Sequence, residues 1–289
     1  MKEKFVDWKP NTESCARLEQ IGVVLEKYES MGIKLTLRQL YYQLVSKNII
    51  RNQQKQYKRL GVLLSKARLG GLIDWDIIED RVRQAQRASQ WSSIKSLVNS
   101  AVASFRLPRW EGQPNYVELW CEKDALSSVL EPICDDLHVT LMVNRGYSSS
   151  SSMYESANRI TAAAAGRPAH IIYLGDFDPS GEDMVRDIRD RMETFQVEVD
   201  VHKLALNPDQ VEEYNLPPNP AKMSDSRAQG FVDRHGESSY EVDALPPEVL
   251  QKMVREEIEG HMDVGAYADV QVEEARLKAT LIKAAGRIK

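Results

Sequence analysis

Carboxylates follow two apolar runs in this chain, and they are the side chains most able to do chemistry. Glu122 comes directly after the run Val117–Cys121, and Asp176 and Asp178 come after the run His170–Leu174. Side chains two residues apart on extended backbone share a face, so Asp176 and Asp178 are expected to point the same way. Two such carboxylates resist joint ionisation unless a cation lies between them. Ligation by carboxylate oxygens alone suits Mg²⁺, with Mn²⁺ as the alternative ion.

The second of these segments also has a purely structural interpretation. The sequence from Asp178 to Asp183 is typical of a turn that opens a helix, with Ser180 as the capping residue and Asp183 at the third position. A turn and a metal site are compatible here, so both interpretations stay open.

A tyrosine pair in Thr36–Tyr42 supplies a candidate nucleophile. Tyr41 belongs to an apolar stripe at helical spacing and is expected to pack in the core. Tyr42 is rotated by about 100° from that stripe and lies one helical turn from Arg38, so we expect it to be exposed. Arg38 could lower the pKa of Tyr42 from its ordinary value of about 10 and hold a phosphate by two parallel hydrogen bonds. The alternative is that Tyr42 only borders a nucleic-acid-binding surface.

Basic residues surround this tyrosine pair. Residues 30–73 contain nine Lys and Arg and no Asp or Glu, and residues 1–110 carry a net charge of +10 against −15 for residues 111–289. Such a division favours a part that faces nucleic acid joined to an acidic part that takes cations. We expect phosphate contacts to double-stranded DNA, with little reading of base sequence. The candidate DNA-binding residues are Arg38, Lys47, Arg51, Lys55, Lys58, Arg59, Lys66 and Arg68.

Composition favours a folded protein of the cytoplasm. Apolar residues make up 42% of the 289 residues and charged residues 28%, as in globular proteins. Cys15, Cys121 and Cys134 show no disulfide-framework spacing. Residues 1–10 do not read as a signal peptide, and no apolar run approaches 18 residues. We therefore expect a cytoplasmic, nucleoid-associated protein with no membrane partner.

The elements that would position these residues fall into two groups. Helical periodicity covers residues 12–30, 36–47 and 53–69, and residues 72–75 are expected to form the first strand of a small wing. This pattern predicts a winged helix-turn-helix domain over residues 1–110, although a plain three-helix bundle would share it. A further helix is expected over residues 81–105.

From Tyr116 onward, strands and helices alternate. Strands are expected over residues 117–121, 139–143, 170–174 and 197–203, with helices over 124–137, 153–165 and 180–192 between them and again from Pro247. This predicts a parallel sheet covered by helices, in a domain spanning 111–289. Ligands of such sheets lie beyond the carboxyl ends of the strands. Ser148–Ser152 is expected to be a mobile loop, and Asn207–Asp225 a Pro-rich connection.

The joint pattern resembles known families. A strand followed by Glu122, then an apolar strand followed by Gly-Asp-x-Asp-x-x-Gly, resembles the TOPRIM fold, a Rossmann-like parallel sheet, of topoisomerases, primases and several nucleases. The segment 144–148 resembles the glycine-containing turn of that fold. Arg-x-x-Tyr-Tyr at 38–42 and Glu-x-Asp-Ala-Leu at 241–245 resemble the A subunit of type IIB topoisomerases and the related meiotic double-strand-break transesterase. The length is more similar to the compact stand-alone Mini-A relatives.

This resemblance implies a site and a mechanism. Asp176 and Asp178 would ligate Mg²⁺, Glu122 would be a ligand or an acid/base residue, and Arg38 would support the phosphate. Tyr42 would attack DNA and leave a 5′-phosphotyrosyl link. The family's tyrosine meets the metal site of another protomer, so a homodimer that cuts both strands is implied.

Other functions fit parts of the same pattern. The chain has no GxxxxGK phosphate loop, so an ATP-driven topoisomerase would need a separate ATPase subunit. The alternatives are a metal-dependent TOPRIM nuclease in which water attacks, a DNA-binding subunit that does not cleave, and an aspartyl phosphatase. The phosphatase fits poorly, because it leaves the basic stretch unexplained.

Overall fold

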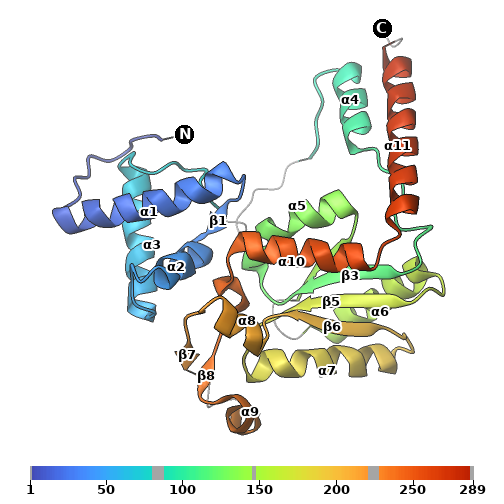
Figure 1. The fold of residues 1–289 in the computed structure, drawn as a ribbon. Coiled ribbons are helices and arrows are strands. Elements are labelled where there is room, and N and C mark those ends of the chain that lie inside the picture. Colours follow the sequence, from blue (N-terminus) through green and yellow to red (C-terminus); the bar gives the residue numbers. More distant parts are fainter. Residues whose placement is uncertain (1, 80–87, 145–147, 221–227, 287–289) are drawn as a thin grey trace.

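The computed structural model describes residues 2–79, 88–144, 148–220 and 228–286. Its centre is a parallel sheet of four strands in the order β4-β3-β5-β6 (Figure 1). The α/β pattern predicted from residue 116 onward is therefore confirmed, and the sheet is compatible with a Rossmann-like domain. Its strands are β3 (Tyr116–Cys121), β4 (Thr140–Val143), β5 (Ala169–Leu174) and β6 (Asp200–Ala205).

Helices cover both faces of this sheet. On β3, Leu119 belongs to one hydrophobic cluster and its neighbour Trp120 to another, because successive side chains of a strand point to opposite faces. One face packs against α5 (Ser127–Leu137) and α10 (Pro247–Gly260), and the other against α6 (Ser150–Ala164) and α7 (Pro179–Thr194). Burial on both sides explains why these strands are apolar almost throughout.

The N-terminal part consists of helices α1 (Thr12–Ser30), α2 (Leu37–Ser46) and α3 (Gln54–Leu69). Their bounds agree closely with the helical periodicity, and Thr36 caps α2 through a capping box with Gln39. The buried side chains of these helices belong to the same hydrophobic cluster as one face of the sheet. The helices are therefore packed on the sheet domain, as Figure 1 shows.

The expected wing is not confirmed. Residues 72–75 form no strand, because the chain there follows bends that Arg68 holds by donating to the carbonyl oxygens of Trp75 and Ile78 at 2.9 and 2.6 Å. Strand β2 (Ile78–Glu79) instead pairs in parallel with β1 (Leu35–Thr36). Any second strand at 80–87, and the turn at 145–147, lie outside the described residues.

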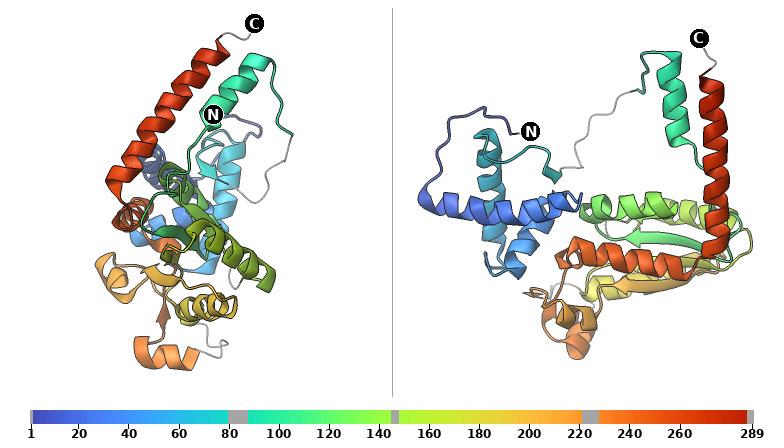
Figure 2. Two further views of the ribbon diagram at one scale, coloured as in Figure 1. Left: turned by 90° about the vertical axis from the view of Figure 1, so that its right-hand side faces the viewer. Right: turned by 45° about the horizontal axis from the view of Figure 1, so that its top comes forward.

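Two helices stand away from the body. α4 (Ile94–Ser104) runs beside α11 (Val264–Ala285), and both project from the sheet domain in the two views of Figure 2. A helix was expected over 81–105, but within the described residues from 88 onward it begins only at Ile94. No helix in the described residues is long and apolar enough to cross a membrane.

Smaller elements complete the chain. The serine run expected to be a loop is partly helical, because Ser149 caps α6 and Ser150–Ser152 form its first turn. The Pro-rich connection contains α8 (Pro208–Glu213) and β7 (Asn219–Pro220). Beyond it lie α9 (Ala228–His235), β8 (Ser238–Ser239) and the 3₁₀ turn η2 (Val242–Ala244), while a second such turn, η1 (Asp124–Leu126), precedes α5.

Candidate active site

Glu122 and Asp176 meet at the carboxyl edge of the sheet. β3 and β5 are neighbours, and the backbone N–H of Glu122 extends their pairing by donating to the carbonyl oxygen of Leu174 at 2.9 Å. The Glu122 carboxylate in turn accepts a hydrogen bond from the backbone N–H of Asp176 at 3.1 Å. The two segments singled out in the sequence therefore lie side by side at the edge where a parallel sheet binds its ligands.

Asp178 caps the helix that follows β5. Its Oδ1 accepts from the backbone N–H of Gly181 at 2.7 Å and from the hydroxyl of Ser180 at 2.8 Å. The expectation that Ser180 caps this helix was wrong, because the extended residue before α7 is Asp178 and its carboxylate reaches the free N–H groups first.

Gly181 allows the helix to approach the strand end. A Cβ atom at Gly181 would lie 2.1 Å from the backbone oxygen of Asp176, far inside any permitted contact. The last glycine of the Gly-Asp-x-Asp-x-x-Gly motif is therefore required by close backbone packing between β5 and α7, which fixes Asp176 beside Asp178.

Asp176 is buried among charges of both signs. Its Oδ1 accepts from the backbone N–H of Val242 at 2.9 Å and pairs with the Lys123 ammonium at 2.8 Å. Burial raises the pKa of Asp176 to about 7, and nearby Glu122 and Glu241 act in the same direction while Lys123 opposes them. A carboxyl group with this pKa exchanges protons near neutral pH and responds strongly to any cation placed beside it.

A network that we call the charged junction links this edge to α2. Lys123 pairs with Glu241 and, at 3.2 Å, with Asp243. Arg38 on α2 pairs with the same two acids, at 3.0 Å from its Nε to Asp243 Oδ2 and with Glu241 through its terminal nitrogen. The charged junction comprises Arg38, Lys123, Asp176, Glu241 and Asp243.

Three members of the charged junction were not predicted from the sequence to be site residues. Lys123 directly follows Glu122, and Glu241 and Asp243 belong to the Glu-x-Asp-Ala-Leu element already singled out as a motif. Their ion pairs hold η2 against α2. Glu241 and Asp243 are two residues apart in that element, and this spacing was the sequence feature that could have identified both carboxylates as site residues.

Tyr42 lies on the same helix as Arg38 but is covered. It is 4% exposed, so the expectation of an exposed Tyr42 was wrong. Periodicity identified the face of α2 that packs on its own domain, but the opposite face packs on η2, and the hydroxyl of Tyr42 accepts from the Asn219 side chain at 3.4 Å. Burial, followed by Glu241 and Asp243, raises the pKa of Tyr42 to about 12, and this outweighs the lowering by Asn219 and Arg38.

Tyr41 behaves as its helical position predicts. It is 4% exposed, and its hydroxyl donates to Asn52 at 2.9 Å and accepts from the backbone N–H of Gln53 at 2.8 Å. These bonds fix Tyr41 as a packing residue that holds the start of α3. The two tyrosine rings lie edge to face with centroids 5.2 Å apart.

The donor chemistry at the sheet edge fits a hard divalent cation. In each of Glu122, Asp176 and Asp178, a backbone N–H holds one carboxylate oxygen. Among the described residues, the second oxygen of each makes no hydrogen bond, which leaves it for a ligand. The described residues contain no group of three or more acids, histidines or cysteines gathered closely enough to ligate one ion. Mg²⁺ needs only one or two carboxylates beside water and phosphate, so the donor set fits it.

The candidate DNA-binding residues do not form one continuous surface. Lys55, Lys58, Arg59 and Lys66 line a pocket along α3, whereas Arg51 lines a separate cavity beside Pro217 and Pro218. Lys47 is exposed at the end of α2. Arg38 and Arg68 are held by internal partners, in the charged junction and in the loop before β2.

No protein-family model matches the chain, and no curated protein shows significant similarity to it.

Proposed function

We propose that this protein cleaves DNA by transesterification, with Tyr42 as the nucleophile and Mg²⁺ at the carboxyl edge of the sheet. The observation that carries the proposal is the charged junction. It joins Arg38, four residues before Tyr42 on α2, to Glu241 and Asp243, which share Lys123 with Asp176. The helix that carries the tyrosine and the arginine is thus connected by ion pairs to the carboxylate edge, which supports the proposal.

The reaction would exchange one phosphodiester for another. The Tyr42 oxygen attacks a backbone phosphorus, the bond to the 3′ oxygen breaks, and that oxygen takes up a proton to leave a free 3′-hydroxyl. In this proposal Glu122 would accept the phenolic proton, and Arg38 would bind the phosphate oxygens. When held by one or two of the carboxylates of Asp176, Asp178 and Glu122, together with water and the phosphate, Mg²⁺ would supply stabilisation of negative charge on the phosphate.

Such chemistry requires the covered tyrosine to become accessible. Tyr42 is 4% exposed and its pKa is about 12, so both access and a lower pKa are needed before it reacts. A DNA phosphate that bound Arg38 would compete with Glu241 and Asp243 for the guanidinium and loosen the contact between α2 and η2. Double-stranded DNA is the proposed substrate.

Two further partners belong to the proposal. A homodimer would place two such sites on opposite strands and so make a double-strand break. A separate ATPase subunit would be needed if cleavage were coupled to strand passage, because the chain carries no phosphate loop of the GxxxxGK type.

Denaturing electrophoresis of labelled DNA tests the proposal. With Mg²⁺ or Mn²⁺ and a labelled duplex, we expect a protein–DNA adduct that survives denaturant and disappears in Tyr42→Phe. Tyr41→Phe is the matched control, since Tyr41 is a packing residue on the next position of α2 and should retain the adduct. An adduct lost in Tyr41→Phe and kept in Tyr42→Phe would contradict the assignment.

Hydrolysis by a metal-dependent nuclease is the second candidate. It is favoured by the burial of Tyr42 and by its raised pKa, which both hinder attack by the phenol. In that reaction Glu122 would activate water and Tyr42 would only contact DNA. Cleavage without any covalent adduct, lost in Asp176→Ala and kept in Tyr42→Phe, would favour it.

A further inference from the structure

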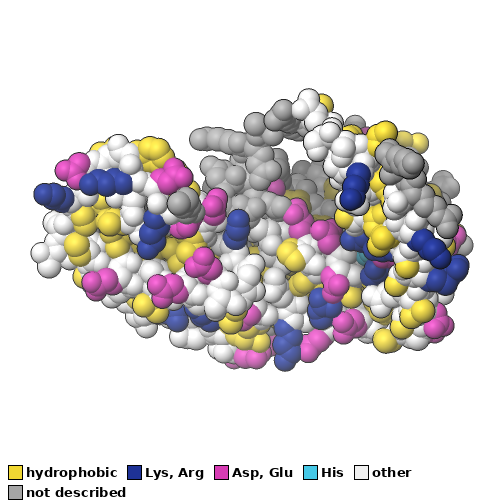
Figure 3. All heavy atoms as spheres, turned by 90° about the horizontal axis from the view of Figure 1, so that it is seen from above, with side chains coloured by type: hydrophobic (Ala, Val, Ile, Leu, Met, Phe, Trp, Pro, Cys, Tyr) yellow, Lys and Arg dark blue, Asp and Glu magenta, His cyan; other side chains and the backbone are white. Residues whose placement is uncertain are grey.

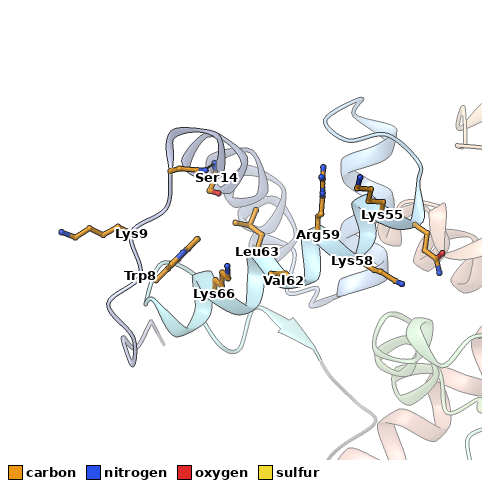
Figure 4. Close-up of a pocket in the computed structure, with 11 residues that line it drawn as sticks. Trp8, Lys9, Ser14, Lys55, Lys58, Arg59, Val62, Leu63 and Lys66 are labelled. Atoms are coloured by element: carbon orange, nitrogen blue, oxygen red, sulfur yellow. Dashed lines mark hydrogen bonds between the residues drawn. The ribbon is translucent and has the colours of Figure 1, made fainter.

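A basic groove follows α3 on the side away from the sheet. The groove has a volume of about 810 Å³ and lies between α3, the start of α1 and the segment at Trp8 and Lys9 (Figure 4). Trp8 and Lys66 lie at one end, and Lys55 lies toward the other. From residue 55 to residue 66 the helix rises about 16 Å. The groove is open to solvent rather than an enclosed cavity, so an extended ligand can enter it from the side.

The charge of the groove is of one sign. Among the described residues that line it there is no Asp or Glu. Its five cations make no ion pair with any described residue: Lys9, Lys55, Lys58, Arg59 and Lys66. Cations that are gathered around a concave surface without internal partners are available to bind an anion, and several of them together suit a polyanion.

Trp8 closes one end of the groove with a fixed aromatic ring. The ring is partly buried against Gly70, where an added Cβ would lie 3.3 Å from its Cε3 atom. The segment before it is tied to the end of α3, since the N–H groups of Phe5 and Val6 both donate to Leu69 at 2.8 and 3.0 Å. The ring is therefore held in place before any ligand binds, and such a ring offers a surface on which a base can stack.

We propose that this groove binds a segment of single-stranded DNA, with its phosphates along α3 and a base stacked on Trp8. The choice of DNA rests on the proposed function, whereas the choice of a single strand rests on the groove itself. An aromatic ring inside a cationic groove recognises unpaired bases, because paired bases are stacked on each other and cannot reach the ring. The five cations of the groove can contact roughly four or five phosphates of such a strand.

Fluorescence anisotropy with labelled oligonucleotides tests this binding separately from cleavage. The protein carries Tyr42→Phe and the buffer contains EDTA, so a failure of the proposed chemistry leaves the result unaffected. We expect a 12-nucleotide single strand to bind more tightly than the blunt duplex of the same sequence and than the matching RNA. The slope of log K against log salt should be about −3, and Lys66→Ala should reduce its magnitude by about 0.7.

The stacking residue has its own set of variants. Trp8→Ala should weaken single-strand binding by at least about fivefold, the low end of base stacking on an aromatic side chain. Trp8→Phe keeps a ring and should restore most of the affinity, which separates stacking from a loss of fold. Trp91→Ala is the matched control, because Trp91 is 47% exposed and lies outside the groove. Equal binding by Trp8→Ala and its parent, or tighter binding of duplex or RNA, would overturn the proposal.

Discussion

At the scale of single residues, Lys123 balances the charge of the candidate site. It is 13% exposed and contacts Asp176, Glu241 and the fully buried Asp243. Burial opposes its charge, but these three acids raise the pKa of Lys123 above its ordinary value. The same ammonium lowers the pKa of Glu241, together with Arg38 and against burial. Lys123 thus offsets the repulsion between three carboxylates that lie close together in a mostly buried site.

Removing this charge should destabilise the protein in a pH-dependent way. In Lys123→Met we expect a loss of about 3 kcal/mol of unfolding free energy at pH 8, because acids are left buried without their partner. The loss should be smaller at pH 5.5. The pKa of Asp176 is raised to about 7, so at pH 5.5 this carboxyl is mostly protonated in the folded parent and loses little when Lys123 is removed, whereas at pH 8 it is ionised and is left without its partner. Urea unfolding at both pH values, in EDTA, measures the difference.

A surface lysine provides the control for this experiment. Lys252 is 74% exposed and lies 3.8 Å from Glu256, so Lys252→Met should change stability by less than about 0.5 kcal/mol at either pH. A Lys123→Met variant that was as stable as the parent, or that lost more stability at pH 5.5 than at pH 8, would contradict the role given to Lys123.

The sequence indicated some of these residues and not others. Glu122, Asp176 and Asp178 were found because strand ends and acids are local patterns. The burial of Tyr42 was missed because the residues that cover it, Asn219 and η2, lie far along the chain. Helical periodicity shows which face of a helix is apolar, but it does not show whether a second element packs on the polar face.

At the scale of elements, the contact between β5 and α7 decides where the carboxylates point. Gly181→Ala should cost at least about 2 kcal/mol of unfolding free energy, since its Cβ would overlap the backbone oxygen of Asp176 and backbone cannot rotate away as a side chain can. Thermal and urea unfolding test this directly.

Another glycine provides a matched comparison for this substitution. Gly22 lies within α1 and has nothing within 4 Å of an added Cβ. Gly22→Ala should therefore stabilise the protein by about 0.5–1 kcal/mol through helix propensity. If Gly181→Ala were also neutral or stabilising, the close approach described for α7 would be wrong.

Most elements could be predicted from the sequence, and the exceptions have physical causes. The strands of the sheet are short apolar runs bounded by turns, and α1 and α3 have clear apolar spacing, so local patterns suffice. The strand expected at 72–75 is not formed, because Leu72, Ile73 and Trp75 resemble a strand in composition while Arg68 holds the backbone there in bends. Side-chain bonds of this kind leave no periodic signal.

At the scale of the whole molecule, the basic and the acidic parts of the chain contact each other through ion pairs. Residues 1–110 carry +10 and residues 111–289 carry −15, and the two parts are joined where Arg38 meets Glu241 and Asp243. On the face seen from above, basic and acidic side chains are interspersed over the N-terminal helices (Figure 3). Five cations that make no ion pair with a described residue line the groove along α3. Some of the basic residues of the N-terminal part therefore take part in the charged junction inside the molecule, and others line the exposed groove along α3.

Mass spectrometry of the trapped adduct tests the central claim most directly. After reaction with DNA and Mg²⁺, digestion with nuclease and trypsin should yield the peptide spanning residues 39–47, which contains both tyrosines. We predict that it carries a nucleotide remnant on Tyr42, joined through a 5′-phosphate. A remnant on Tyr41 or on another residue, or cleaved DNA with no modified peptide, would contradict the proposal that Tyr42 and the carboxylate edge act as one site.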